Sequence, residues 1–207
     1  MKNLLVIKAH PFTGEQSTSM KVLEKFIDVY QAENADTATV QLLDLYSEDI
    51  PEIDHLLLSA MTDLKTGVNF SDLTAEQQAK MNRFNELTDQ FLAADQIVIA
   101  NALWNLNIPT RLKAWVDTIN VANKTFKYTA TGPVPLTEGK KVLHIQSNGG
   151  MYDGKDFASM YLKGIMNFVG VTDYHQLFIE AIDHHPEQRD EILGKAFDSA
   201  TAIAKEF

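Results

Sequence analysis

The chain has 207 residues, of which 45% are hydrophobic and 22% are charged, a balance typical of a soluble globular protein. It contains no cysteine, which excludes disulfides, thiolate metal sites, iron–sulfur clusters and cysteine nucleophiles. The formal net charge of −10 disfavours a general nucleic-acid binder, because an acidic surface repels phosphate backbones.

The N-terminal apolar run, residues 4–7, is too short for a signal-peptide core, and neither it nor any later run is long enough to cross a membrane. We therefore expect a cytoplasmic protein without membrane insertion. The length and even composition predict a single domain spanning residues 1–207.

Strand-like and helix-like segments alternate along the chain. The predicted strands lie, in chain order, at residues 4–7, 40–45, 97–100, 142–145 and 177–179. Between the first two, a helix is predicted by apolar residues at three- and four-residue spacing: Val22, Leu23, Phe26, Ile27 and Tyr30. Residues 74–77 have the form of a capping box, and an apolar stripe follows it.

Prolines mark the starts of two later helices. Pro109 can open a helix because the first turn needs no amide donor there, and Trp115 lies on its apolar face. Pro186 begins the last predicted helix. The residues expected inside these later helices are Leu112, Val116 and Ile119, then Tyr161, Ile165 and Phe168, and finally Ile192, Phe197 and Ile203.

This alternation predicts an α/β fold with a mainly parallel sheet and helices on both faces. Five strands match a flavodoxin-like doubly wound sheet with the order 2-1-3-4-5. Two segments interrupt the pattern. Residues 50–73 form a long connection with a helix near residues 56–64, and residues 125–137 look like a small hairpin or an ordered loop.

Ligands of such sheets bind beyond the carboxyl ends of the strands, near the switch in strand order. The loop after the first strand runs from His10 to Ser19 and ends in hydroxyl residues. With the amides of the following helix, these hydroxyls suit a phosphate. The plainer interpretation is that Ser17 or Thr18 only caps the helix.

The loops after the third and fourth strands also suit a planar ligand. Residues 102–109 place Trp104 before Asn105 and Asn107, which offers stacking surface and amides that read ring edges. Gly149 and Gly150 let the backbone approach a ligand closely, although a tight turn is their commoner use. A core tryptophan beside an asparagine-rich turn is the alternative for the first of these loops.

At these loops the chain resembles the FMN-dependent NADH azoreductases, which belong to the flavodoxin-like NAD(P)H:quinone oxidoreductases. The resemblance runs over nearly the whole chain. The segments that carry it are Lys8-Ala9-His10-Pro11, Trp104-Asn105-Leu106-Asn107-Ile108-Pro109, Leu112-Lys113, Asp117, Thr125-Phe126-Lys127-Tyr128-Thr129, Gly132-Pro133, Lys140-Lys141 and Ser147-Asn148-Gly149-Gly150. The chain departs from the family at three positions. The family often has Ser where this chain has His10 and Pro where it has Ala102. Some members carry His or another residue where this chain has Tyr152.

The resemblance implies bound FMN, with NADH or NADPH as electron donor and a quinone or azo compound as acceptor. It implies FMN contacts from His10, Gln16, Ser17 and Thr18 around the phosphate, and from Leu103, Trp104, Asn105, Leu106, Ser147, Asn148, Gly149 and Gly150 around the ring. The two substrates would take turns in a ping-pong hydride transfer, because the flavin carries the redox chemistry. It also implies a homodimer.

Two residues are candidates for catalysis. Amides and side chains near Asn105 and Gly149 would stabilise negative charge on the reduced ring. Tyr152 would line the acceptor pocket or relay a proton, or it would only pack over the ring. His184 and His185 do not predict a metal site, because adjacent residues rarely point at one ion.

The competing hypothesis is a flavin-binding electron carrier, or an ancillary subunit of a membrane transporter, without turnover of its own. Residues 125–137 and the asparagine-bearing loop favour the enzyme. Oxidation of NADH with a quinone distinguishes the two hypotheses.

Overall fold

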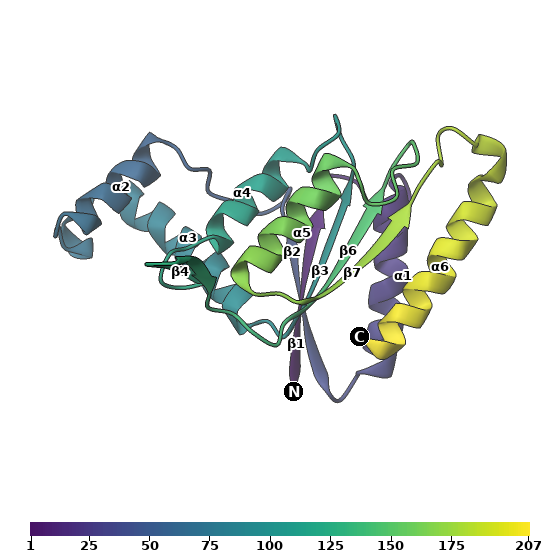
Figure 1. The fold of residues 1–207 in the computed structure, drawn as a ribbon, viewed down its shortest axis with the longest axis horizontal. Helices are drawn as coiled ribbons and strands as arrows, with labels where there is room; N and C mark the ends of the chain where they lie inside the picture. Colours follow the sequence, from purple (N-terminus) through teal and green to yellow (C-terminus); the bar gives the residue numbers. More distant parts are fainter.

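The computed structural model describes residues 1–207 and is built around a five-stranded parallel sheet (Figure 1). Its strands are β1 (Lys2–Ala9), β2 (Ala38–Asp44), β3 (Gln96–Ala102), β6 (Lys141–Ser147) and β7 (Asp173–Ile179). They lie in the order β2-β1-β3-β6-β7, which is the predicted 2-1-3-4-5. The strand order therefore switches direction between β1 and β3, where a ligand is expected.

The chain has six α-helices, five of which cover the two faces of the sheet. They are α1 (Thr18–Glu33), α2 (His55–Lys65), α3 (Ala75–Ala93), α4 (Thr110–Ile119), α5 (Phe157–Val169) and α6 (Arg189–Glu206), with short 3₁₀ turns η1 (Phe70–Asp72) and η2 (Pro186–Gln188). Helices α1 and α6 lie side by side on one face, and α3, α4 and α5 cover the other (Figure 1). None of these helices combines the length and the apolar character needed to cross a bilayer.

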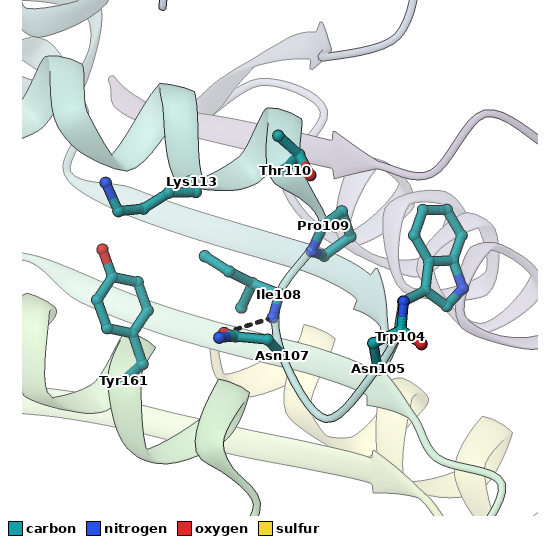
Figure 2. Close-up of a pocket in the computed structure, with 8 residues that line it drawn as sticks. All are labelled: Trp104, Asn105, Asn107, Ile108, Pro109, Thr110, Lys113 and Tyr161. Atoms are coloured by element: carbon teal, nitrogen blue, oxygen red, sulfur yellow. Dashed lines mark hydrogen bonds between the residues drawn. The ribbon is translucent and has the colours of Figure 1, made fainter. Parts of the chain in front are cut away.

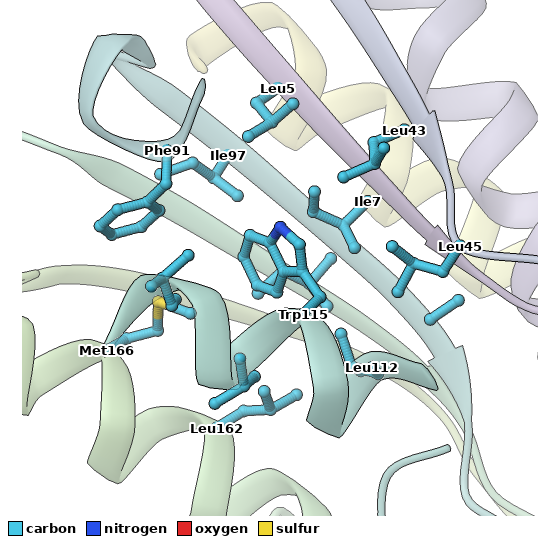
Figure 3. Packing of buried hydrophobic residues seen from close by; sticks show 14 of the residues in the cluster. Leu5, Ile7, Leu43, Leu45, Phe91, Ile97, Leu112, Trp115, Leu162 and Met166 are labelled. Carbon is cyan, nitrogen blue, oxygen red and sulfur yellow. The ribbon is translucent and has the colours of Figure 1, made fainter. Parts of the chain in front are cut away.

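Successive residues of β1 feed two separate cores because side chains alternate across a strand. Leu5 and Ile7 pack with Trp115 of α4 in the larger core (Figure 3), whereas Leu4 and Val6 face α1 and α6. Both faces of the strand are therefore covered, which explains its uninterrupted apolar run.

The predicted helix ends are correct for α3 and shifted for α4. Thr74 accepts a hydrogen bond from the Gln77 amide, and the Gln77 side chain accepts one from the Thr74 amide, so the capping box is present. Helix α4 begins at Thr110, and Pro109 is its N-cap rather than its first helical residue.

Ile192, Phe197 and Ile203 lie inside α6, as predicted, and pack half-buried against the core. The buried side chains of this helix are Ala196, Ala200 and Ala204. Small side chains let α6 approach α1 closely, a choice that depends on the neighbouring helix and that periodicity alone does not show.

The two interruptions have their own structure. Helix α2, η1 and the start of α3 share a small satellite core that contains Leu57, Leu73 and Phe84. Helix α2 projects from the main body (Figure 1). Strands β4 (Phe126–Thr129) and β5 (Gly132–Pro135) pair antiparallel as a separate two-stranded sheet.

Candidate functional site

Three loops at the carboxyl ends of β1, β3 and β6 lie in contact with one another. The ring of His10, after β1, lies 5.1 Å from the ring of Trp104, after β3. The amide of Leu103 donates to the carbonyl of Ser147, after β6, over 2.9 Å. Residues from all three predicted loops therefore meet at one edge of the sheet.

The N-terminus of α1 keeps unpaired hydrogen-bond donors. Ser17 is its N-cap but makes no side-chain capping bond, and its hydroxyl lies 3.2 Å from that of Ser19. The amides of Thr18 and Ser19 have no acceptor within the chain. Unpaired amides at a helix start favour an anion, so this donor set fits a phosphate group.

A cation from a distant part of the chain lies at the same place. Arg189, the first residue of α6, donates from Nη2 to the Thr18 hydroxyl over 3.3 Å. Arg189 and Lys21 border a small depression that Gln16, Ser17 and Thr18 also line. Nothing in the sequence around Arg189 signals this position, because 171 residues separate it from Thr18.

His10 is held as a neutral hydrogen-bond donor. Its side chain is buried, and its Nδ1 accepts from the Phe12 amide over 3.1 Å. A nitrogen that accepts carries no proton, so the imidazole proton lies on Nε2. Burial lowers the pKa of His10, and Lys8 lowers it further. At neutral pH, His10 therefore offers a single N–H.

The loop after β3 closes in a strained two-residue turn. Trp104 and Asn107 exchange backbone hydrogen bonds of 3.1 and 3.0 Å, and the central residues Asn105 and Leu106 have φ values of 50° and 62°. Positive φ at both central positions favours Asn-Gly, so leucine at the second position is costly. Strain of this kind is common at ligand-binding sites.

A cavity of about 460 Å³ lies beside this turn, between α4 and α5 (Figure 2). Its lining residues are Trp104, Asn105, Asn107, Ile108, Pro109, Thr110, Lys113 and Tyr161. Burial raises the pKa of Tyr161 to about 12, with a further contribution from Asp117. Tyr161 thus keeps its proton at neutral pH and remains a donor.

The cavity contains only part of the predicted site. Trp104 and Asn105 line it, whereas His10, the phosphate-binding candidates and residues 147–150 do not. Lys113, which pairs with Asp117 at 2.6 Å, and Tyr161 were not predicted as site residues. Sequence spacing placed them only on two helices, and those helices meet only in the folded chain.

Loop residues 147–150 are held tightly. Asn148 is only 1% exposed, and its amide donates to the carbonyl of Ile179 over 2.8 Å. Tyr152 is half-buried, and its ring would lie 3.2 Å from a Cβ atom at Gly150. The candidate residue Tyr152 therefore packs against the glycine loop.

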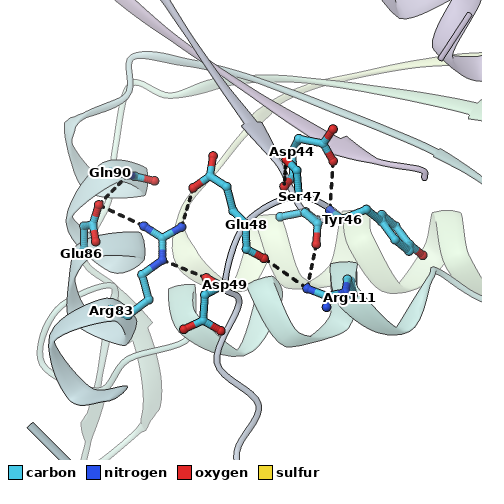
Figure 4. Close-up of polar contacts among 10 residues, drawn as sticks. Asp44, Tyr46, Ser47, Glu48, Asp49, Arg83, Glu86, Gln90 and Arg111 are labelled. Carbon is cyan, nitrogen blue, oxygen red and sulfur yellow. Dashed lines mark hydrogen bonds and ion pairs between the residues drawn. The ribbon is translucent and has the colours of Figure 1, made fainter. Parts of the chain in front are cut away.

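The loop after β2 also reaches this edge, which the sequence did not predict. Tyr46 lies 6.4 Å from Trp104, ring to ring, and its amide donates to Asp44. Arg111 of α4 donates to the carbonyls of Leu45 and Glu48 over 3.0 and 3.2 Å (Figure 4). These bonds join the β2 loop to the helix that follows the Trp104 turn.

Comparison with protein families and curated proteins gives consistent matches. A family model described as a flavodoxin-like fold matches residues 2–203. The chain is 44% identical over 207 residues to the FMN-dependent NADH:quinone oxidoreductase of Streptococcus suis (strain 98HAH33), and both chains are covered completely. It is 43% identical to the protein of the same name from Staphylococcus haemolyticus (strain JCSC1435), again with complete coverage of both.

Solved structures show the same similarity. An azoreductase from Bacillus anthracis (strain Sterne) superposes with a TM-score of 0.91 at 32% identity, covering all of both chains. An FMN-dependent NADH-azoreductase from Bacillus anthracis (strain Ames Ancestor), solved in complex with FMN, gives a TM-score of 0.89 at 33% identity. That comparison covers 99% of this chain and 100% of the other.

Proposed function

The chain belongs to the family of flavodoxin-like FMN-dependent NADH:quinone oxidoreductases, and we propose that it reduces quinones and azo compounds with electrons from NADH or NADPH. The observation that carries this proposal is the meeting of the β1, β3 and β6 loops around a donor set that fits FMN. FMN, when bound, supplies the acceptance and return of a hydride, and the protein supplies position and electrostatics.

Each loop has a separate part in holding FMN. The uncapped first turn of α1, with Gln16, Ser17 and Thr18, would bind the phosphate, and the N–H at His10 Nε2 would donate to the same end of the cofactor. Residues 103–106 and 147–150 would hold the isoalloxazine ring. The family resemblance and the donors at these positions support this assignment.

Asn105 and Tyr152 are the proposed catalytic residues. Asn105 lies at the tip of the strained turn, whose ends are joined by the two backbone hydrogen bonds between Trp104 and Asn107. Donors held in advance stabilise developing negative charge because they need no reorganisation during the reaction. Tyr152, packed on the glycine loop, lines the acceptor site and supplies or takes a proton.

We propose a ping-pong order, in which donor and acceptor occupy one site in turn. Steady-state rates measured against NADH at several quinone concentrations should then give parallel double-reciprocal lines. Intersecting lines would mean that both substrates are bound together and would contradict this order.

A visible spectrum tests the cofactor and the donor. The purified protein should be yellow, or become so with added FMN, and its flavin bands should bleach when NADH is added without oxygen. Repeating the titration with NADPH measures the donor preference. A colourless protein that takes up no FMN would refute the proposal.

We further propose that the protein is a homodimer, joined through the outer face of α5. Phe157, Met160, Gly164 and Phe168 follow one another at three- and four-residue spacing and are exposed, and Tyr128 of the neighbouring hairpin is 74% exposed. The opposite face of α5 is buried in the core. An exposed apolar stripe of this kind, bordered by the exposed Lys163 and Asn167, is typical of an interaction surface, which a second copy would cover.

A charge in the middle of this face should separate the subunits. We expect Met160→Glu to halve the mass measured by sedimentation and to reduce quinone turnover. The matched control is Leu42→Glu, which changes an exposed leucine on the edge strand β2 and should leave the dimer intact. A monomeric wild-type protein would contradict the proposal.

A further inference from the structure

The segment that follows β7 is joined to the loop that follows β6 by backbone hydrogen bonds. The amide of Asn148 donates to Ile179 over 2.8 Å, and the amide of Ala181 donates back to Gly150 over 3.0 Å. The contact therefore continues beyond the last paired residues of the two strands, Ser147 and Ile179.

The carboxylate of Glu180 binds this loop at three points. Its Oε1 accepts from the side-chain amide of Asn148 over 2.9 Å, from the Tyr152 amide over 2.9 Å and from the Asp153 amide over 3.0 Å. Hydrogen bonds to an ionised acceptor are roughly twice as strong as neutral ones. One side chain thus links residues 148, 152 and 153 of the loop.

Asn148 is fixed from its other end by a buried polar network. Its Oδ1 accepts from Gln146 Nε2 over 2.9 Å, and the Gln146 Oε1 in turn accepts from Asn101 over 3.1 Å. Asn101 and Gln146 are fully buried. These hydrogen bonds restrict rotation of the Asn148 side chain. They thereby help to fix the loop backbone at this residue.

The backbone around Glu180 is strained at two positions. Ala181 has a φ of 62° and Asp153 a φ of 54°, in the region that L-residues avoid. A Cβ atom at Gly149 would lie 2.8 Å from the carboxylate of Asp183, so only glycine fits there without movement. Such strain persists only where the surrounding contacts enforce it.

We propose that Glu180 is a positioning residue for the flavin: its carboxylate holds residues 147–150 in the shape that receives the ring, acting through Asn148 and the amides of Tyr152 and Asp153. It need not touch the ring itself. This inference rests on the proposed function, because it concerns the loop assigned there to FMN.

The test compares apoproteins of the wild type, Glu180→Ala and Glu180→Gln, with Glu33→Ala as the control for loss of an exposed glutamate on α1. We expect the Kd for FMN to rise about tenfold in Glu180→Ala, because three charge-assisted hydrogen bonds are lost. Glu180→Gln keeps one accepting oxygen and should give an intermediate Kd. Glu33→Ala should bind as the wild type does.

Two further readouts separate positioning from general stability. Hydrogen exchange at the Tyr152 and Asp153 amides of the apoprotein should accelerate in Glu180→Ala, while the sheet amides keep their protection. The visible circular dichroism of bound FMN should change in Glu180→Ala and recover partly in Glu180→Gln. A merely structural role would lower the melting temperature without altering either the Kd or the flavin spectrum.

The outcomes distinguish this inference from the proposed function. A wild-type apoprotein that binds no FMN would refute the function itself. Normal binding by the wild type, with an unchanged Kd in Glu180→Ala, would overturn only the role of Glu180. If Glu180→Ala does not fold, Glu180→Gln decides: a raised Kd supports the proposal, and a wild-type Kd with an unchanged flavin spectrum overturns it.

Discussion

Buried His144 should make the free energy of unfolding of this protein fall as the pH is lowered. The ring is fully buried in β6, and its Nε2 lies 2.8 Å from Asn101 Oδ1. That oxygen accepts, since the Asn101 amide nitrogen donates to Gln146, so His144 Nε2 carries the proton. Its Nδ1 is buried without a partner. A second proton would have no acceptor there.

The size of the effect follows from the pKa. Burial lowers the pKa of His144 from 6.5 to about 4, with Asp156 opposing the shift. The unfolded chain therefore binds more protons than the folded protein between these values, and stability falls as the pH drops through this range. The full loss below pH 4 is about 3 kcal/mol, and about 2 kcal/mol of it is reached between pH 7 and pH 5.

The variant His144→Gln removes the titrating group and keeps a side-chain N–H for Asn101. Urea denaturation at pH 7 and pH 5 should show that the wild type loses about 2 kcal/mol more than this variant over the interval. The control His55→Gln, at an exposed position that begins α2, should follow the wild type. Equal losses in the wild type and His144→Gln would refute the reasoning.

Three other substitutions test separate parts of the structure. Leu106→Gly relieves the φ of 62° and should raise the melting temperature of the apoprotein by about 3 °C while weakening FMN binding, whereas Asn105→Gly should stabilise less because asparagine tolerates this region. A lower melting temperature for Leu106→Gly would contradict this. Thr74→Ala removes the α3 cap and should cost about 1 kcal/mol of unfolding free energy, with no change in the Kd for FMN. Ser17→Ala removes no capping bond, so it should raise the Kd for FMN with little loss of unfolding free energy. If Thr74→Ala and Ser17→Ala changed the Kd and the unfolding free energy equally, Ser17 would not be a phosphate-binding residue.

The sequence alone was sufficient to predict the sheet. Five apolar runs separated by helical periodicity predict parallel strands covered on both faces, and the observed order agrees. The capping box at Thr74 was likewise readable, because its two hydrogen bonds join residues three positions apart. The loops that carry the candidate site could also be located, since the carboxyl ends of parallel strands share one edge.

What the sequence left undetermined depends on residues far apart in the chain. Arg189 reaches Thr18, and Tyr161 lines the cavity beside the Trp104 turn, only because the fold packs α6 beside α1 and α5 beside α4. The fully buried side chains of α6 are alanines, because the close approach of α1 decides which side chains fit. The hydrogen bonds of Glu180 to the loop after β6 arise in the same way. Local patterns determine elements and their order, whereas the tertiary structure determines which donors, charges and strained turns meet at the site.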